Sequence, residues 1–354
     1  MGPEVTAEGV KILGAVGRRF HHAFTFREGQ IGAGVFERTG KALPEETIEI
    51  CRLSDAVLLG AVGSPRWEKP GLGVGPERGY GLIRLRKELG LFANVRPVRV
   101  FSSLLDSTNL KPDMVEGVDL VIVRELTGGI YFGQPKQLLR TPWGRRAIDT
   151  MAYSEEEIRR IVRVGFELAR GRRKRLTSVD KFQILRTSDL WREIAVEVSS
   201  EYPDVELEHS LADSFAMRLI LSPKEFDVVV TESLFGDILS DEASVLAGSL
   251  GMMPSASLAG IPGSGNKLFG LYEPIHGSAP GLAGLNIANP IATALSTAMM
   301  LRYSFALTDE ATSIEDGVDL VLREGYRTGD IMGGGNKRVG TAEMGSLIAA
   351  RVAG

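Results

Sequence analysis

The chain has 354 residues, of which 44 % are hydrophobic and 24 % charged, and this is the composition of an ordinary globular enzyme. Its net charge of −4 disfavours a nucleic-acid-binding surface, and no apolar run is long enough to cross a membrane, so we expect neither partner. Cys51 is the single cysteine, so no intrachain disulfide can form. A reducing compartment, the cytoplasm, is therefore expected.

Strands and helices alternate over the first two thirds of the chain, which predicts an α/β fold. The first predicted element is an amphipathic helix starting near residue 5, although such domains usually open on a strand. Further helices are expected after Pro44, over 82–89, from the capping box at Ser154 to Ala169, and around Trp191. Buried strands are expected at 56–62, 119–124, 205–209 and 226–230 and just before Lys181, with a glycine- and proline-rich loop at 63–81.

The texture changes after residue 248. Residues 248–290 are rich in Gly, Pro, Ser and Ala and show little periodicity, so no regular element is predicted there. Helices are expected over 291–301, 314–323 and 342–352.

Two carboxylates, Asp237 and Asp241, follow the predicted strand at 226–230. If the next helix begins near Phe235, both side chains project from the same helix face, one turn apart. Their charges then repel each other, and a divalent cation would remove the conflict. A solvated acidic face is the alternative, and for an isolated pair of this kind it is the more common case.

Three arginines precede this pair along the chain. Arg124 ends a predicted strand, and the carboxyl ends of buried parallel strands are where open α/β sheets bind ligands. A guanidinium matches a carboxylate in bidentate fashion, so Arg86, Arg96 and Arg124 are candidates for binding an acidic substrate. The alternative is that they are structural partners of Asp or Glu.

Tyr131, Lys181 and Asp213 are candidate reactive groups. Tyr131 lies among glycines, where it can point into a cleft as an acid or can simply be a core tyrosine. Lys181 ends a predicted strand and is a candidate general base, although an exposed lysine is the more common case. Asp213 lies in a mostly apolar helical pattern, where a buried carboxylate needs a partner and a helix cap is the simpler explanation.

The stretch His276 to Ala279 offers successive backbone N–H groups in a turn, which suits a phosphate. Neither a GxGxxG nor a Walker sequence is present, so a generic glycine-rich turn is the alternative.

Together these stretches resemble the β-hydroxyacid oxidative decarboxylases of the isocitrate/isopropylmalate dehydrogenase family, over nearly the whole chain. The isopropylmalate branch is the most similar, and isocitrate, homoisocitrate and tartrate dehydrogenases are relatives. The most specific matches are residues 85–97 (LRKELGLFANVRP), 124–133 (RELTGGIYFG), 235–241 (FGDILSD), 273–280 (EPIHGSAP) and 288–290 (ANP).

The resemblance implies a two-domain, non-Rossmann α/β fold of the isopropylmalate dehydrogenase type. Residues 1–91 with 248–354 would form a cofactor-binding domain, and residues 92–247 an inserted domain for dimerisation, substrate and metal. The family opens with a strand and a Gly-Asp-Gly-Ile turn, whereas this chain begins beyond that turn, so the first strand is expected to be missing. A homodimer with shared active sites is also implied.

The resemblance further implies that Arg86, Arg96 and Arg124 hold the substrate carboxylates. Asp237 and Asp241, with Asp213 of the other subunit, would bind Mg²⁺ or Mn²⁺. Lys181, also of the other subunit, would remove the hydroxyl proton, and Tyr131 would protonate the enolate left after CO₂ departs. The dinucleotide contacts would come from Gln183, Glu273, His276, Gly277, Ser278, Ala279 and Asn289.

Aliphatic Leu82, Ile83 and Ile184 stand where isopropylmalate enzymes line the isopropyl pocket. This favours oxidative decarboxylation of (2R,3S)-3-isopropylmalate to 4-methyl-2-oxopentanoate with NAD, as in leucine biosynthesis. Arg84 is an additional cation, so tartrate-, homoisocitrate- or isocitrate-type substrates stay open, as does a non-catalytic regulatory homologue.

Three further positions depart from the family pattern. Gln183 and Ser233 each replace an Asn, and Gly281 replaces the Asp that binds the adenosine ribose in NAD-preferring members. No cation for a 2′-phosphate appears beside Gly281, so NAD is expected over NADP, although the exact preference stays open.

Overall fold

The computed structural model describes residues 1–63, 81–263 and 265–354. Its helices are α1 Gly2–Phe20, α2 Ala33–Thr39, α3 Glu45–Arg52, α4 Leu82–Glu88, α5 Pro112–Val115, α6 Glu155–Arg170, α7 Arg186–Ser199, α8 Ala212–Leu221, α9 Ser233–Ala243, α10 Ile291–Ser304, α11 Thr308–Arg323 and α12 Thr341–Ala353. Its strands are β1 Val57–Leu58, β2 Ala93–Arg99, β3 Asp119–Glu125, β4 Gln137–Thr141, β5 Gly144–Ile148, β6 Arg175–Asp180, β7 Glu206–Leu211, β8 Val228–Thr231, β9 Pro254–Leu258, β10 Gly270–Pro274, β11 Tyr326–Arg327 and β12 Lys337–Arg338.

One mixed sheet runs through the molecule in the order β1-β10-β9-β2-β3-β8-β6-β7. Strand β9 is antiparallel to both of its neighbours, β10 and β2, and β2 is antiparallel to β3. From β3 to β7 every neighbouring pair is parallel. The predicted α/β class is confirmed, with a sheet that changes direction near its middle.

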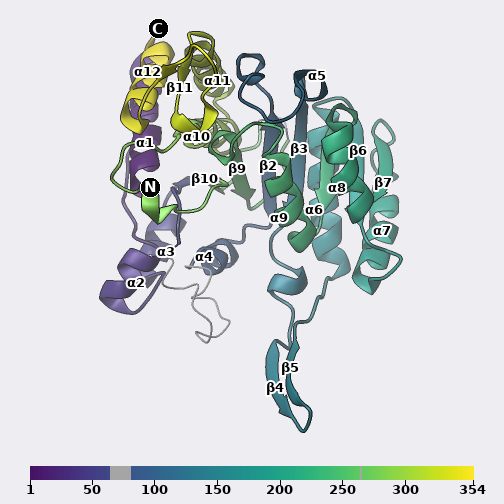
Figure 1. Cartoon of the computed structure of the whole chain (residues 1–354). Helices are drawn as coiled ribbons and strands as arrows, with labels where there is room; N and C mark the ends of the chain where they lie inside the picture. Colours follow the sequence, from purple (N-terminus) through teal and green to yellow (C-terminus); the bar gives the residue numbers. More distant parts are fainter. Residues whose placement is uncertain (64–80, 264) are drawn as a thin grey trace.

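The two ends of the chain lie side by side. Helix α1 packs against α12 and α10, and α10 lies on β9 and β10, so the purple and yellow segments form one side of Figure 1. The middle of the chain forms the other side, where α6 packs beside α7 and α8 beside α9, against the parallel strands. The hairpin β4–β5 projects away from both groups (Figure 1).

Local sequence explains why several helices begin where they do. The Ser154 side chain accepts a hydrogen bond from the Glu157 backbone, and the Glu157 carboxylate accepts one from the Ser154 backbone, so the predicted capping box starts α6. Glu232 performs the same task for α9, because its carboxylate accepts hydrogen bonds from the backbone N–H groups of Leu234 and Phe235. Helix α9 therefore begins at Ser233, two residues earlier than predicted.

Two strand predictions were wrong. The strand expected at 56–62 is reduced to Val57–Leu58, which is half-buried at the end of the sheet. The region 248–290 was expected to lack regular structure, yet it contains β9 and β10, which are buried along their whole length. Small side chains fit under the close-packed helix α10, so an apolar run is not needed there. Residues 64–80 of the predicted loop lie outside the described residues.

Cys51 of α3 is buried in a small apolar cluster. Among the residues the structure describes, no helix has the length and apolar character needed to cross a membrane.

Candidate active site

A cavity of about 320 Å³ opens where α4, α9 and the ends of β2, β3 and β10 meet. Its lining includes residues of four of the five stretches on which the family resemblance rests, namely 85–97, 124–133, 235–241 and 273–280. The predicted site residues that line it are Leu82, Ile83, Arg86, Arg96, Arg124, Tyr131, Asp237, Glu273, His276 and Gly277.

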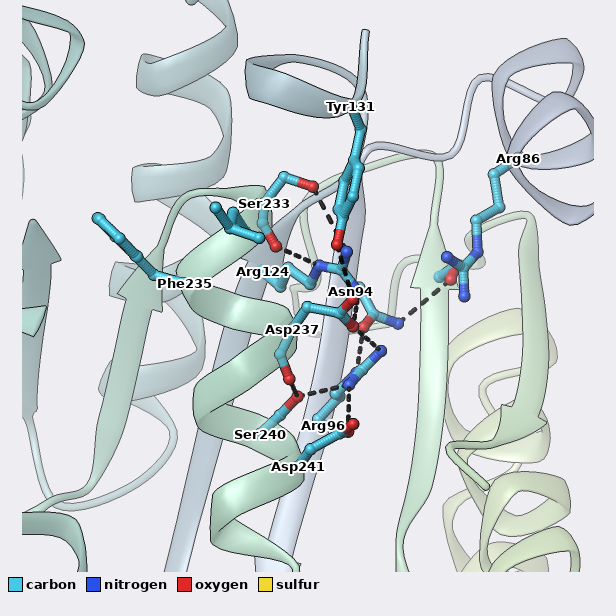
Figure 2. Close-up of polar contacts among 12 residues, drawn as sticks. Arg86, Asn94, Arg96, Arg124, Tyr131, Ser233, Phe235, Asp237, Ser240 and Asp241 are labelled. Carbon is cyan, nitrogen blue, oxygen red and sulfur yellow. Dashed lines mark hydrogen bonds and ion pairs between the residues drawn. The ribbon is translucent and has the colours of Figure 1, made fainter. Parts of the chain in front are cut away.

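Arg96 is a buried cation held from several directions, with 6 % of its surface exposed. Its Nε donates to the Asn94 side chain at 2.6 Å, and its Nη1 donates to the Ser240 hydroxyl of α9 (Figure 2). Burial, followed by the neighbouring Arg124, lowers the pKa of Arg96 to about 10. The side chain therefore still carries its charge at neutral pH and is available to a carboxylate.

Arg124 lies directly beneath α9. Its Nε donates to the Ser233 carbonyl at 2.8 Å, and its Nη1 donates to Asp237 Oδ1 at 2.5 Å. Burial lowers the pKa of Arg124, and Asp237 partly offsets that effect. A Cβ atom at Gly236 would lie 2.6 Å from Cγ of Arg124, so glycine is what lets the helix approach the arginine so closely.

Asp237 and Asp241 project from the same face of α9, as predicted (Figure 2). Arg96 lies 3.6 Å from each carboxylate. Burial raises the pKa of Asp237, but Arg124 and Arg96 outweigh it and hold that pKa below its usual range. Burial raises the pKa of Asp241 above its usual range, and the attraction of Arg96 does not offset it, because the negative charge of Asp237 also raises that pKa.

Tyr131 points at Asp237 and donates its hydroxyl proton to Oδ2 at 2.8 Å (Figure 2). Burial and the negative charge of Asp237 raise the pKa of Tyr131 to about 12. The phenol is thus protonated at neutral pH, which is the state that a proton donor requires.

Two further arginines of α4, Arg84 and Arg86, are held in ion pairs. Arg86 of α4 donates to Glu273 of β10 at 2.6 Å, which links the two sides of the cavity. Arg84, the additional cation in the sequence, forms ion pairs with Glu45 at 2.5 Å and Glu88 at 3.7 Å, and it does not line the cavity.

The expected dinucleotide residues fall into two groups. His276 and Gly277 line the cavity, and Nε2 of His276 is buried without a hydrogen-bond partner among the described residues. Ser278 and Ala279 lie beyond the lining, and Ala279 adopts a left-handed backbone with φ 35°. Asn289 donates to Asp330 at 3.0 Å and accepts a hydrogen bond from the backbone of Ile291, the first residue of α10.

Comparison with known proteins places this geometry in a family. The sequence model of the isocitrate/isopropylmalate dehydrogenase family matches residues 1–348 of the chain. The chain belongs to the isocitrate/isopropylmalate dehydrogenase family. The 3-isopropylmalate dehydrogenase of Dehalococcoides mccartyi is 58 % identical over 100 % of this chain and 97 % of that protein. The enzyme of the same name from Pseudomonas putida is 53 % identical over 99 % of this chain and 95 % of its own.

A solved member of the family has the same overall structure. The isocitrate dehydrogenase from Methylococcus capsulatus superposes with a TM-score of 0.85 at 33 % identity, over 99 % of this chain and 96 % of that one. The resemblance inferred from the sequence is therefore confirmed.

Among the predicted site residues, Asp241, Ser278, Ala279 and Asn289 do not line the cavity, and the Asp241 side chain is exposed. Four more belong to the segment after β6 and to α8, away from the cavity: Lys181, Gln183, Ile184 and Asp213. Lys181 Nζ donates to Asp213 at 2.7 Å. That hydrogen bond is the main cause that lowers the pKa of Asp213. The sequence left open whether Asp213 is a buried carboxylate or a helix cap. It is neither, because its side chain is exposed on the first turn of α8 and the N-cap position is Leu211. Among the described residues no three acidic, His or Cys side chains gather as metal ligands.

Several residues that shape the site were not singled out from the sequence: Asn94, Tyr153, Glu232, Gly236 and Ser240. Asn94 and Arg96 are two apart on β2, so strand periodicity alone would have placed them on one face. Ser240 is one helical turn from Asp237 and would likewise have been found on the acidic face. No sequence signal identifies Tyr153, which reaches the site from the segment before α6.

Proposed function

We propose that the chain catalyses the oxidative decarboxylation of (2R,3S)-3-isopropylmalate to 4-methyl-2-oxopentanoate and CO₂ with reduction of NAD, the leucine-biosynthetic reaction. The observation that supports this most is the composition of the cavity, where three guanidinium groups face an aliphatic wall of Leu82 and Ile83. Relatives named for this activity are 58 % and 53 % identical over nearly the whole chain.

The charges of the site suit a dicarboxylate bound together with a divalent cation. The three cations Arg86, Arg96 and Arg124 are balanced by three carboxylates, those of Asp237, Asp241 and Glu273. A divalent ion adds two positive charges, and the two carboxylates of the substrate cancel them. Such a balance matters most for Arg96, Arg124 and Glu273, which are buried, since an unmatched charge in a low-dielectric site is costly.

The aliphatic wall selects among related acids. Leu82 and Ile83 offer the isopropyl group apolar contact, which is worth about 0.8 kcal/mol for each buried methylene-sized group. An acid with a third carboxylate would need a cation at this wall, and Arg84, the additional cation of α4, is engaged by Glu45 and Glu88. These contacts favour isopropylmalate over isocitrate.

The residues present fit a metal ion and a dinucleotide. Asp237 and Asp241 supply hard oxygen donors from one helix face, as Mg²⁺ and Mn²⁺ prefer. The unpartnered Nε2 of His276 beside Gly277 offers a buried polar contact, and we assign the dinucleotide to that end, with Glu273, Ser278, Ala279 and Asn289 nearby. When bound, the metal would polarise the ketone oxygen as a Lewis acid and NAD would accept the hydride.

The protein's own groups manage the protons. Lys181 would take the proton of the substrate hydroxyl as that carbon is oxidised. After the bond to CO₂ breaks and its electron pair remains on the enolate, Tyr131 would donate the proton that completes the product. The raised pKa of Tyr131 keeps this proton in place until it is needed.

We further propose that Lys181, Gln183, Ile184 and Asp213 act in the cavity of a second copy. Four large apolar side chains are exposed: Met217 and Leu221 on α8, Ile238 on α9, and Ile184 in the segment between β6 and α7. Pairing that face with its copy would bury them and would carry Lys181 and Asp213 to the partner's Asp237 and Asp241. Residues 92–247 would then form the substrate, metal and dimerisation domain, and 1–91 with 248–354 the cofactor domain.

Steady-state turnover tests the function. We expect the purified protein to form NADH from NAD with 3-isopropylmalate and Mg²⁺ or Mn²⁺, to release one CO₂ per NADH, and to stop when a chelator is added. Isocitrate, tartrate and malate, each with NAD and with NADP, are measured in parallel. Absence of turnover with every one of these acids and both cofactors would refute the enzyme.

Subunit complementation tests the shared site. Lys181→Ala and Asp237→Ala chains are expected to be inactive alone, whereas a refolded equal mixture regains about a quarter of the wild-type activity, because half of the dimers hold one intact site. A mixture as inactive as its components would contradict sharing between copies.

A further inference from the structure

We infer that Tyr153 is a positioning residue, which sets the contact between Tyr131 and Asp237. This inference rests on the proposed function, because Tyr131 is assigned there as the proton donor. Tyr153 does not line the cavity and lies in the segment between the β4–β5 hairpin and α6. It nevertheless contacts both elements that carry the reacting pair.

Its hydroxyl group is bonded to the start of α9. The Ser233 backbone N–H donates to Tyr153 Oη at 2.9 Å, and Oη donates to the Glu232 carboxylate at 3.3 Å. Burial raises the pKa of the Tyr153 phenol and also that of the Glu232 carboxyl group. The Tyr153 hydroxyl therefore keeps its proton at neutral pH. The first N–H groups of a helix lack partners within the helix, and Tyr153 therefore fixes the first turn of α9, one turn before Asp237.

Its ring supports the turn that leads to Tyr131. A Cβ atom on Gly128 would lie 2.5 Å from the Tyr153 ring, and one on Gly129 would lie 2.4 Å from its hydroxyl oxygen. The Gly129 N–H donates to the Ala152 carbonyl at 2.8 Å, and this bond ties the turn to the residue before Tyr153. Gly129 begins the short 3-10 turn that ends at Tyr131.

Tyr153 is itself held in place. Its ring meets Trp191 of α7 edge-on, with ring centroids 5.9 Å apart. Trp191 is buried, and its Nε1 donates to Ser178 of β6. The Tyr153 ring thus links two parts of the site, the turn before Tyr131 and the start of α9, to Trp191 and through it to the sheet. The 2.8 Å separation of the Tyr131 hydroxyl from Asp237 depends on the position of both.

The test is a double-mutant cycle in the full-length protein. Tyr153→Phe keeps the ring and removes both hydrogen bonds, and we expect kcat to fall about tenfold while KM for 3-isopropylmalate changes less than about twofold. In a Tyr131→Phe background the same change should cost less than about twofold, because it acts through the lost hydroxyl. Tyr202→Phe is the matched control, since Tyr202 is a buried tyrosine stacked on Phe166, outside the cavity, and its kcat should equal that of the wild type.

Gly128→Ala supplies a second variant, which displaces the same ring and leaves its hydroxyl in the protein. We expect the same loss of kcat with little change of KM. An unchanged kcat for Tyr153→Phe, a loss that is fully additive with Tyr131→Phe, or an equal loss in Tyr202→Phe would overturn the inference. A wild-type protein that turns over none of the acids would instead refute the proposed function, so the two failures are distinguishable.

Discussion

Gly236 is the position where a single methyl group should disable the site. The Cβ atom of Gly236→Ala would lie 2.6 Å from Cγ and 2.8 Å from Cβ of Arg124, distances at which something must move. Arg124 cannot simply swing aside, because its Nε is bonded to the Ser233 carbonyl and its Nη1 to Asp237. Either a bond to Arg124 breaks or the helix that carries Asp237 and Asp241 lifts from the sheet.

The magnitude follows from these two effects. Overpacking costs about 1–3 kcal/mol, and alanine recovers about 1 kcal/mol relative to glycine inside a helix, so stability should fall by about 0–2 kcal/mol. A displacement of about 1 Å at the site should lower kcat/KM on the order of 100-fold. The activity loss is thus expected to be far larger than the stability loss.

Gly14→Ala is the matched control, since it is also a helical glycine and its nearest neighbour to an added Cβ is the end of the Arg18 side chain at 3.6 Å. It should gain about 1 kcal/mol and keep full activity. The assays are denaturant unfolding and steady-state kinetics on both variants. A Gly236→Ala protein with kcat/KM near that of the wild type would refute the reasoning.

Three other predictions concern metal, cofactor and folding. Because burial raises the pKa of Asp241, a proton competes with the metal for this carboxylate at a higher pH than for an ordinary aspartate. The Mn²⁺ affinity, measured by titration, should therefore be lower at about pH 5 than at about pH 8, and Asp241→Asn should weaken Mn²⁺ binding at both pH values. Equal affinity in the variant and the wild type would speak against the assignment. Gly281 has open space for a side chain, and Gly281→Asp would supply the carboxylate expected to bind the adenosine ribose. This variant should lower KM for NAD about two- to tenfold and weaken the binding of NADP. A KM for NAD that does not fall would show that this position is not near the ribose. Asp227 is a fully buried carboxylate that accepts hydrogen bonds from the Arg172 side chain and from the Arg173 backbone. Asp227→Ala should lower the free energy of unfolding in denaturant by about 3–5 kcal/mol and leave kcat unchanged. A loss below about 1 kcal/mol would contradict this structural role.

The sequence predicted those elements that carry their own local signal. The capping box at Ser154 and the apolar run before Asp237 gave α6 and β8 nearly at their observed bounds. Strands β9 and β10 were missed because their stability comes from neighbours on both sides and from α10 above them, not from an apolar run. The hairpin β4–β5 was missed for the opposite reason, since its strands are exposed and pair only with each other.

The candidate site divides in the same way. Residue type and order predicted Arg86, Arg96, Arg124, Tyr131 and Asp237, which the fold brings to one cavity. Local sequence could not reveal how they are positioned, because Tyr153 and Gly236 act through contacts with residues distant along the chain. Lys181 and Asp213 form a pair outside this cavity, and their assignment depends on a second copy.

The central claim is that this cavity selects 3-isopropylmalate through its aliphatic wall. Its most direct test is the ratio of kcat/KM for 3-isopropylmalate to that for isocitrate, measured with NAD and a saturating divalent cation. Three buried carbon groups at about 0.8 kcal/mol each predict a ratio of at least about 50 in favour of 3-isopropylmalate. A ratio near or below one would contradict the claim.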